Sequence, residues 1–151
     1  MNNQMRKALR PVCDLADRLA DQFQELASAV QDGPAEPTEE LLAKIRNLAK
    51  QVPGIESETE SAADEEQEKL DNLNEGHLAG PMGQRLEETA EALQDALDYA
   101  QSAMAYVGDL SEAIPVPGKT IDKNDLVDAL DALSDCLEQC HDALDEAIGL
   151  P

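Results

Sequence analysis

Two cysteines and a histidine stand close together near the end of the sequence, as Cys136, Cys140 and His141. A c-type haem attachment site has two residues between its cysteines, whereas this segment has three. The first residues of the chain also lack the uninterrupted apolar run of an export signal, which haem attachment requires. We therefore expect Cys140 to lie in a helical core with Cys136 beside it, and we expect no haem.

Metal binding is the second kind of chemistry that this region suggests. Glu138 and His141 form the Glu-x-x-His pair of di-iron helical bundles, but such a site needs a second pair from another helix. His77 is the other histidine and follows a glycine, so the sequence has no second pair. The residues from Asp122 onward begin like a calcium loop, yet its glycine and final glutamate are missing. Helix capping by Asp122 explains this segment better, and we expect no metal or other cofactor.

Carboxylates that recur at every third or fourth residue are the most regular chemical pattern. Residues so spaced lie on one face of a helix, about 5 Å apart along its axis. Lysine and arginine are scarce in the same segments, whereas an ordinary solvated helix mixes both signs. The pattern predicts two acidic helix faces. The partner-binding candidates are Glu88, Glu91, Asp95 and Asp98 in one segment and Asp128, Asp131, Asp135, Glu138, Asp142 and Asp145 in the other.

Two tyrosines lie beside a gap in the first acidic row. Tyr99 and Tyr106 stand on the neighbouring line of the helix, on either side of Ser102 and Ala105, where acids are missing. Aromatic side chains are frequent anchors of protein interfaces. We therefore expect an exposed tyrosine patch inside the acidic surface. No phosphate-binding loop or activated nucleophile accompanies these residues, so we expect a protein that is not an enzyme.

The formal net charge of the 151-residue chain is −22, and it is unevenly distributed. Residues 1–50 carry seven Lys or Arg against eight Asp or Glu, whereas residues 51–151 carry four against twenty-five. Such a field attracts basic surfaces and repels phosphates, so we expect a partner protein with a basic surface and no direct binding to nucleic acid or membrane. Three cysteines without a disulfide framework favour a reducing, cytoplasmic location.

Apolar residues recur in steps of four and three along the segments that must hold these side chains. In the last segment they are Leu126, Leu130, Leu133, Leu137, Cys140, Leu144 and Ala147. Similar rows predict helices over about residues 11–31, 39–52, 61–75, 82–113 and 122–148. Pro53-Gly54 is expected to end the second helix, and residues 56–61 are expected to form a solvated linker.

Residues 11–151 are expected to form one all-α domain, an elongated antiparallel helical bundle with coiled-coil-like heptad seams. A helix over 82–113 would be about 48 Å long, so the two shorter helices before it can together run beside it. Residues 1–10 precede Pro11 and form either an N-terminal arm or a kinked extension of the first helix. Regular seams also close homodimers, so pairing within one chain and between two chains are both open.

The run DEEQEKLDNLNE over residues 64–75 is followed by a glycine-containing break and the acidic, alanine-rich segment LEETAEALQDALDYAQSA. These segments resemble a pattern that recurs in small acidic helical proteins encoded by phages and mobile elements. The resemblance implies a helical hairpin and a phage context, and it assigns no functional residues.

Two functions fit these observations. The first is a non-enzymatic acidic inhibitor or nucleic-acid mimic, phage-encoded and directed against a host or defence protein, whose nucleic-acid-binding surface it would occupy. The alternative is a dimeric structural or adaptor bundle that binds its partner through apolar positions and the tyrosine patch. A housekeeping protein from a high-salt environment is a third reading. Salt separates the first two, because exposed charge contacts are screened.

Overall fold

The computed structural model describes residues 1–73, 76, 79–114 and 120–150. The described residues form the helices α1 (Asn3–Asp32), α2 (Glu39–Ala49), α3 (Val52–Asp71), α5 (Pro81–Ala113) and α6 (Lys123–Gly149). No strand occurs among these residues. The predicted all-α fold is confirmed.

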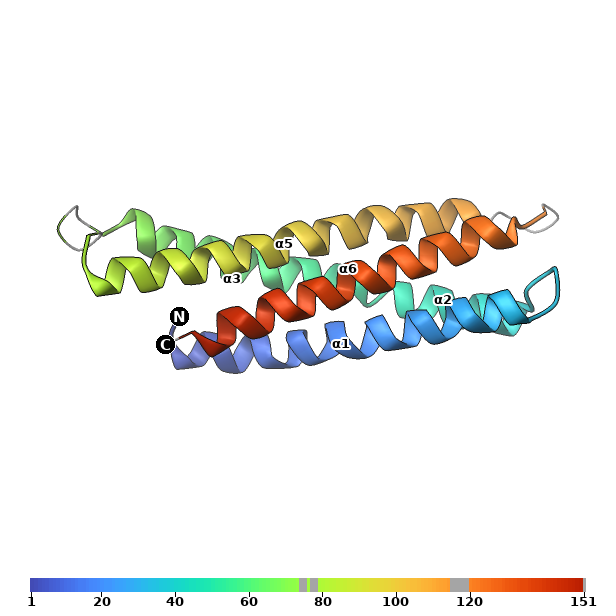
Figure 1. The fold of residues 1–151 in the computed structure, drawn as a ribbon, viewed down its shortest axis with the longest axis horizontal. Helices are drawn as coiled ribbons and strands as arrows, with labels where there is room; N and C mark the ends of the chain where they lie inside the picture. The colour runs from blue at the N-terminus through green and yellow to red at the C-terminus, as the bar shows by residue number, and fades with distance from the viewer. Residues whose placement is uncertain (74–75, 77–78, 115–119, 151) are drawn as a thin grey trace.

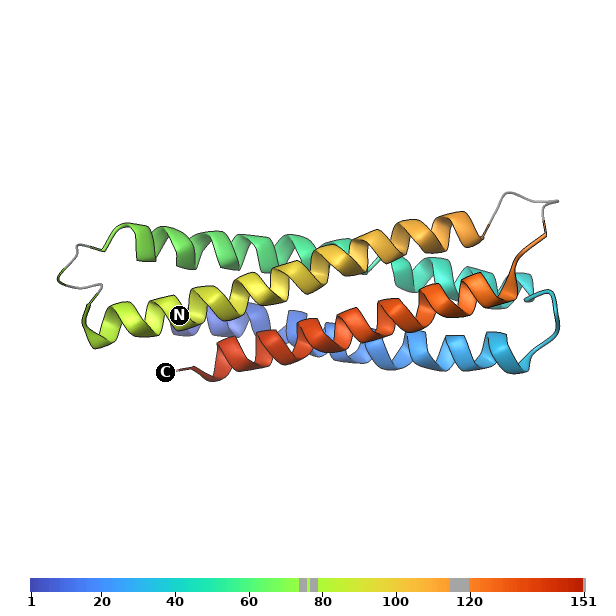
Figure 2. The same ribbon diagram turned by 45° about the horizontal axis from the view of Figure 1, so that its top comes forward.

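The helices pack as an elongated antiparallel bundle (Figure 1). α2 and α3 follow each other along one side and together run antiparallel to α5, as the predicted length of α5 required (Figure 2). α6 packs on both α1 and α5, and α5 packs on both α6 and α3. Both chain termini lie at the same end of the bundle (Figure 2).

The predicted apolar row of α6 is buried at every position from Leu126 to Ala147. Burial also reaches Ala129, Ala143 and Ile148, which lie on either side of that row. The two-position stripe of a coiled-coil seam is therefore only part of the buried face. α6 buries a wider face because it packs against two neighbouring helices.

α1 continues through Pro11, which lies on its exposed side. Residues 3–10 belong to this same helix, and Met5 and Leu9 contribute to the core. Asn2 caps the start of the helix, and its side chain accepts a hydrogen bond from the Met5 backbone N–H at 2.8 Å. Proline removes one backbone hydrogen bond, and burial of apolar residues in the preceding turns offsets that loss.

The helix stop predicted at Pro53-Gly54 and the linker predicted over residues 56–61 are wrong. α3 begins at Val52 and contains both segments. Proline fits the first turn of a helix, because the backbone N–H groups there have no partner within the helix. Ile55 and Thr59 are buried, and the Thr59 hydroxyl donates to the Ile55 carbonyl at 2.7 Å. The polar sequence therefore forms an amphipathic helix.

The observed starting positions of α5 and α6 agree with the prediction. α5 begins at Pro81, and the Asp122 side chain caps α6 by accepting hydrogen bonds from the backbone of Asn124 at 2.9 Å and Asp125 at 3.3 Å. α3 ends at Asp71, and the last two residues of the run over 64–75 lie outside the described residues.

Candidate protein-binding face

All ten carboxylates predicted to bind a partner are exposed on α5 and α6. These two helices pack against each other, so the two acidic rows lie on neighbouring helices of the bundle (Figure 2). We call this set the acidic face. It comprises Glu88, Glu91, Asp95, Asp98, Asp128, Asp131, Asp135, Glu138, Asp142 and Asp145.

The α6 row of the acidic face does not stay beside α5. Asp128 lies near α5, where it lines a hollow together with Tyr106. At 3.6 residues per turn, Asp145 lies about a quarter-turn away on the other flank of the row, toward α1. Burial is the main cause of the raised pKa of the Cys13 thiol on α1, and the negative charge of Asp145 is the second cause. The acidic face is therefore a curved surface that turns from α5 toward α1.

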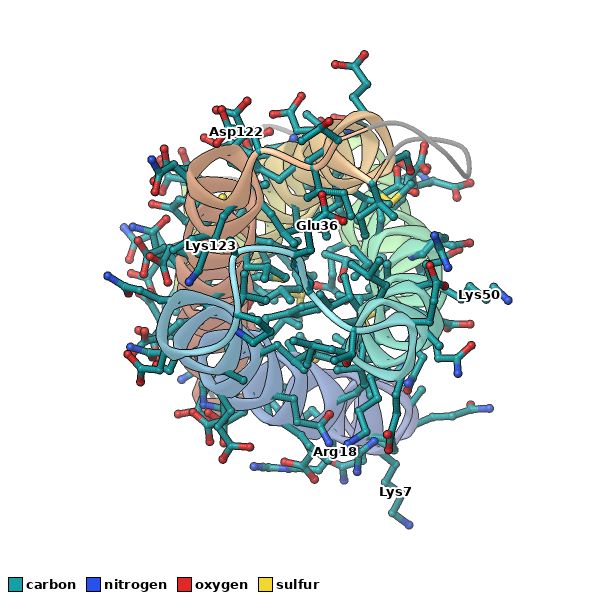
Figure 3. All side chains as sticks on the ribbon, turned by 90° about the vertical axis from the view of Figure 1, so that its right-hand side faces the viewer. Lys7, Arg18, Glu36, Lys50, Asp122 and Lys123 are labelled. Carbon is teal, nitrogen blue, oxygen red and sulfur yellow. The ribbon has the colours of Figure 1, made fainter. Side chains whose placement is uncertain are left out.

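Basic partners are scarce around the acidic face. α5 contains one basic residue, Arg85, and α6 contains one, Lys123. The Lys123 ammonium donates to the Gly33 carbonyl at 2.9 Å, which holds it between α6 and α1 (Figure 3). Within the described part of the chain, no carboxylate of the acidic face forms an ion pair. Solvent ions therefore balance the negative charge of this surface.

A hollow of about 600 Å³ lies between α5 and α6 near the start of α6. Carboxylates surround it, and Tyr106 forms part of its wall. The residues that line it are Tyr106, Asp109, Glu112, Ala113, Asp125, Asp128, Ala129 and Ala132. Three of these acids lie outside the predicted set, because sequence periodicity does not tell which flank of one helix meets which flank of the next.

The two tyrosines differ in exposure. Tyr99 is 37% exposed on α5, whereas Tyr106 is half-buried and packs against the core. Tyr106 meets the α6 residues of the hollow, and Tyr99 lies two helical turns before it on the same flank of α5. The two tyrosines thus border the acidic face on the same flank of α5, and Tyr106 reaches the hollow beside α6.

α3 adds further acids to the surface, of which Glu58 and Glu60 were predicted to lie in a linker. Glu58, Glu60, Asp64, Glu65 and Glu68 are exposed on this helix, which packs beside α5. The signal that identifies α3 is the spacing of its buried positions in steps of three and four. Those positions are Val52, Ile55, Thr59, Ala62, Ala63 and Glu66.

A cysteine and a histidine join α1 to α6. The Cys13 Sγ lies 3.2 Å from the His141 Nδ1, which is 3.0 Å from the Cys13 carbonyl oxygen. The Cys13 thiol also contacts the His141 carbonyl at 3.5 Å. Burial raises the pKa of Cys13 to about 11 and that of Cys140 to about 12. Both thiols stay protonated near neutral pH, so this contact serves packing rather than nucleophilic chemistry.

The predicted roles of the later cysteines are confirmed, since Cys140 is buried and Cys136 is half-buried beside the core. The Cys13–His141 contact was missed, because the two residues are far apart in the sequence and have no common motif. The described residues hold no group of three or more His, Cys, Asp or Glu placed to bind a metal. His77 lies outside the described residues.

No described helix combines the length and apolar character needed to cross a membrane. Comparison of the chain with protein-family models, with curated proteins and with solved structures gave no match. The geometry of the acidic face is therefore the basis for a functional argument.

Proposed function

We propose that this protein is a non-enzymatic, cytoplasmic acidic inhibitor that occupies the nucleic-acid-binding surface of a partner protein. The observation that carries the proposal is the acidic face, whose ten carboxylates are exposed on adjacent helices and unpaired within the described structure. A basic surface would supply the positive charges that this face lacks. The phage or mobile-element context, with a host or defence protein as target, is part of the same proposal.

The spacing of the charges supports mimicry of nucleic acid. The α6 row has six carboxylates between Asp128 and Asp145. At about 1.5 Å per residue this row spans about 25 Å, which gives roughly one charge every 5 Å. Phosphates of one DNA strand recur about every 3.4 Å along the helix axis. The row is less dense than a DNA strand, and the neighbouring acids of α5 raise the charge of the same surface.

The scaffold supports a rigid presentation of these charges. α6 is buried along its inner side between α1 and α5, so its backbone is held by packing on both flanks. A preorganised surface loses less conformational entropy on binding than a flexible acidic segment does. An acidic helix face held in this way can therefore compete with nucleic acid more effectively than the same sequence unfolded.

Two variants with equal charge changes test this proposal. The α6 five-acid variant carries Asp128→Asn, Asp131→Asn, Asp135→Asn, Glu138→Gln and Asp142→Asn. The α1 five-acid variant alters five exposed acids elsewhere and carries Asp14→Asn, Asp17→Asn, Asp21→Asn, Glu25→Gln and Asp32→Asn.

Proteins captured from an extract of the source organism on the wild-type chain are eluted with duplex DNA, purified and titrated. We expect DNA to compete and the α6 five-acid variant to bind about 10- to 100-fold more weakly, because each exposed charge contact contributes about 0.2–1 kcal/mol. The α1 five-acid variant should bind within a few-fold of wild type. Undiminished binding by the α6 variant would refute the proposal.

The exposure of Tyr99 favours a second candidate function, a dimeric structural or adaptor bundle. In that case Tyr99→Ala should weaken partner binding or self-association, and the contact should persist at high salt. Binding through the acidic face should instead weaken steeply as salt is raised, since exposed charges are screened.

A further inference from the structure

The side of the bundle formed by α2 and α3 has a break that the other sides lack. α2 ends at Ala49 and α3 begins at Val52, so the helical path is interrupted at Lys50 and Gln51. α2 packs on α1, whereas α3 packs mainly on α5 and also on α1. An open groove lies beside this break, against the last turns of α5.

Apolar side chains form most of this groove. Ile45, Ala49 and Pro53 contribute from the α2 and α3 side. Val107, Leu110 and Ile114 contribute from α5, and the groove has a volume of about 430 Å³. Volumes of about 300–1,000 Å³ are typical of small-molecule sites, which are mainly apolar with a few polar groups.

The polar groups at the groove have a charge opposite to that of the protein. Arg46 and Lys50 are exposed beside the apolar residues, and Ser111 completes the lining. No carboxylate is among the described lining residues, although the chain has 33 Asp and Glu. Arg46 has one weak partner, Glu39, at 4.0 Å, and both side chains are solvated. Both cations are therefore available to an anionic ligand.

The size of the groove restricts what can occupy it. One linear apolar chain fits this volume, and the two cations beside the groove favour a chain with an anionic head group. We propose that the groove binds a single-chain apolar carboxylate, with its chain along Ala49, Pro53 and Val107 above the buried floor of Ile45 and Leu110, and its carboxylate beside Arg46 and Lys50. This inference is independent of the function proposed for the acidic face.

Three probes with straight ten-carbon chains and different head groups test the charge preference. Decanoate, decanol and decyltrimethylammonium are titrated below their micelle concentrations into the full chain, and the methyl resonances of Ile45, Leu110 and Ile114 are followed by NMR. We expect decanoate to bind most tightly and the cationic probe most weakly, although the net charge of −22 favours the reverse order.

Variants then locate the site. Arg46→Gln with Lys50→Gln should weaken decanoate binding about five- to tenfold and leave decanol unchanged, in line with two exposed ion pairs. The control, Lys7→Gln with Arg18→Gln, makes the same charge change on α1 and should have no effect (Figure 3). Ser111→Phe should fill the groove and weaken binding of both decanoate and decanol.

The outcomes are distinguishable even if a variant folds poorly, because the head-group order is measured on the wild-type chain. Equal binding of all three probes, or preference for the cation, would overturn the proposal. Methyl shifts confined to other parts of the bundle would also overturn it. Loss of decanoate binding in the α1 control would show that general charge, not the groove, selects the anion.

Discussion

Helices α1 and α6 pack along each other with similar buried faces, yet their exposed faces differ in charge. α1 has four basic and five acidic residues, whereas α6 has one basic and eight acidic residues. Lys7 and Arg18 project from α1 into solvent (Figure 3). Since both helices fold with apolar inner faces, the bundle does not require an acidic exterior. The excess charge of α6 opposes compactness through self-repulsion, and this supports the role in binding proposed for the acidic face.

The largest expected effect tests whether the two helices are equivalent inside the bundle. Phe23 of α1 and Leu133 of α6 are both fully buried. Phe23→Ala should lower the free energy of unfolding by about 3–5 kcal/mol and Leu133→Ala by about 2–5 kcal/mol, through lost burial and a remaining cavity. Urea denaturation followed by circular dichroism measures both. A small effect at Leu133 alone would show that α6 contributes less to the core than its burial indicates.

The next largest expected effect is a change of stability with pH that is caused by Cys140, which is buried in α6 near its contact with α1. Burial, with smaller contributions from Cys13 and Cys136, raises the pKa of the Cys140 thiol from 9.0 to about 12. The folded state therefore keeps a proton that the unfolded state loses above pH 9, so stability falls as pH rises from 9 toward 12. At pH 10.5 the loss is about 2 kcal/mol.

Cys140→Ala removes this titration and provides the control. The difference in unfolding free energy between wild type and Cys140→Ala should be constant below pH 9 and should shrink by about 2 kcal/mol by pH 10.5. The two proteins differ only at this side chain, so the change in the difference with pH reports on the Cys140 thiol. A difference that does not change with pH would contradict the assigned burial of Cys140.

The smallest effect concerns the exposed faces themselves. The α6 five-acid variant should be more stable than wild type by about 1–2 kcal/mol at low salt, because it relieves several like-charge pairs of about 0.2–0.5 kcal/mol each. The α1 five-acid variant should gain less, since Arg10 and Arg18 stand four residues before and after Asp14. Urea denaturation at low and high salt measures both gains. Equal gains, or gains that persist at high salt, would remove the contrast between the two helices.

The sequence predicted the fold where apolar periodicity and helix ends agreed. The row from Leu126 to Ala147 and the cap at Asp122 are both confirmed. The prediction was wrong at Pro53-Gly54, because a proline that fits the first turn of one helix was taken as the end of another. Polar residues then concealed the first half of α3, whose buried positions are few and include Thr59.

The candidate site was predictable only in part for a different reason. The 3.6-residue period identifies which residues of one helix are exposed together. It does not identify the neighbouring helix, so the hollow beside Tyr106 and the approach of Asp145 to Cys13 were not predicted. The groove beside Arg46 depends on how α2, α3 and α5 meet, which no local pattern encodes.

The contact between the first and last helices also determines how the protein responds to mechanical force. α1 and α6 are joined at one end by the Arg6 guanidinium, which donates to the Leu150 carbonyl, and at the other by Lys123 and Gly33. Both termini lie at the same end of the bundle. Tension applied to them therefore separates α1 from α6 progressively from that end, and only a few side-chain contacts bear the force at a time. Tension between that end and the opposite one loads the whole α1–α6 contact in shear. The bundle should therefore yield at low force when pulled by its termini and resist stretching along its length.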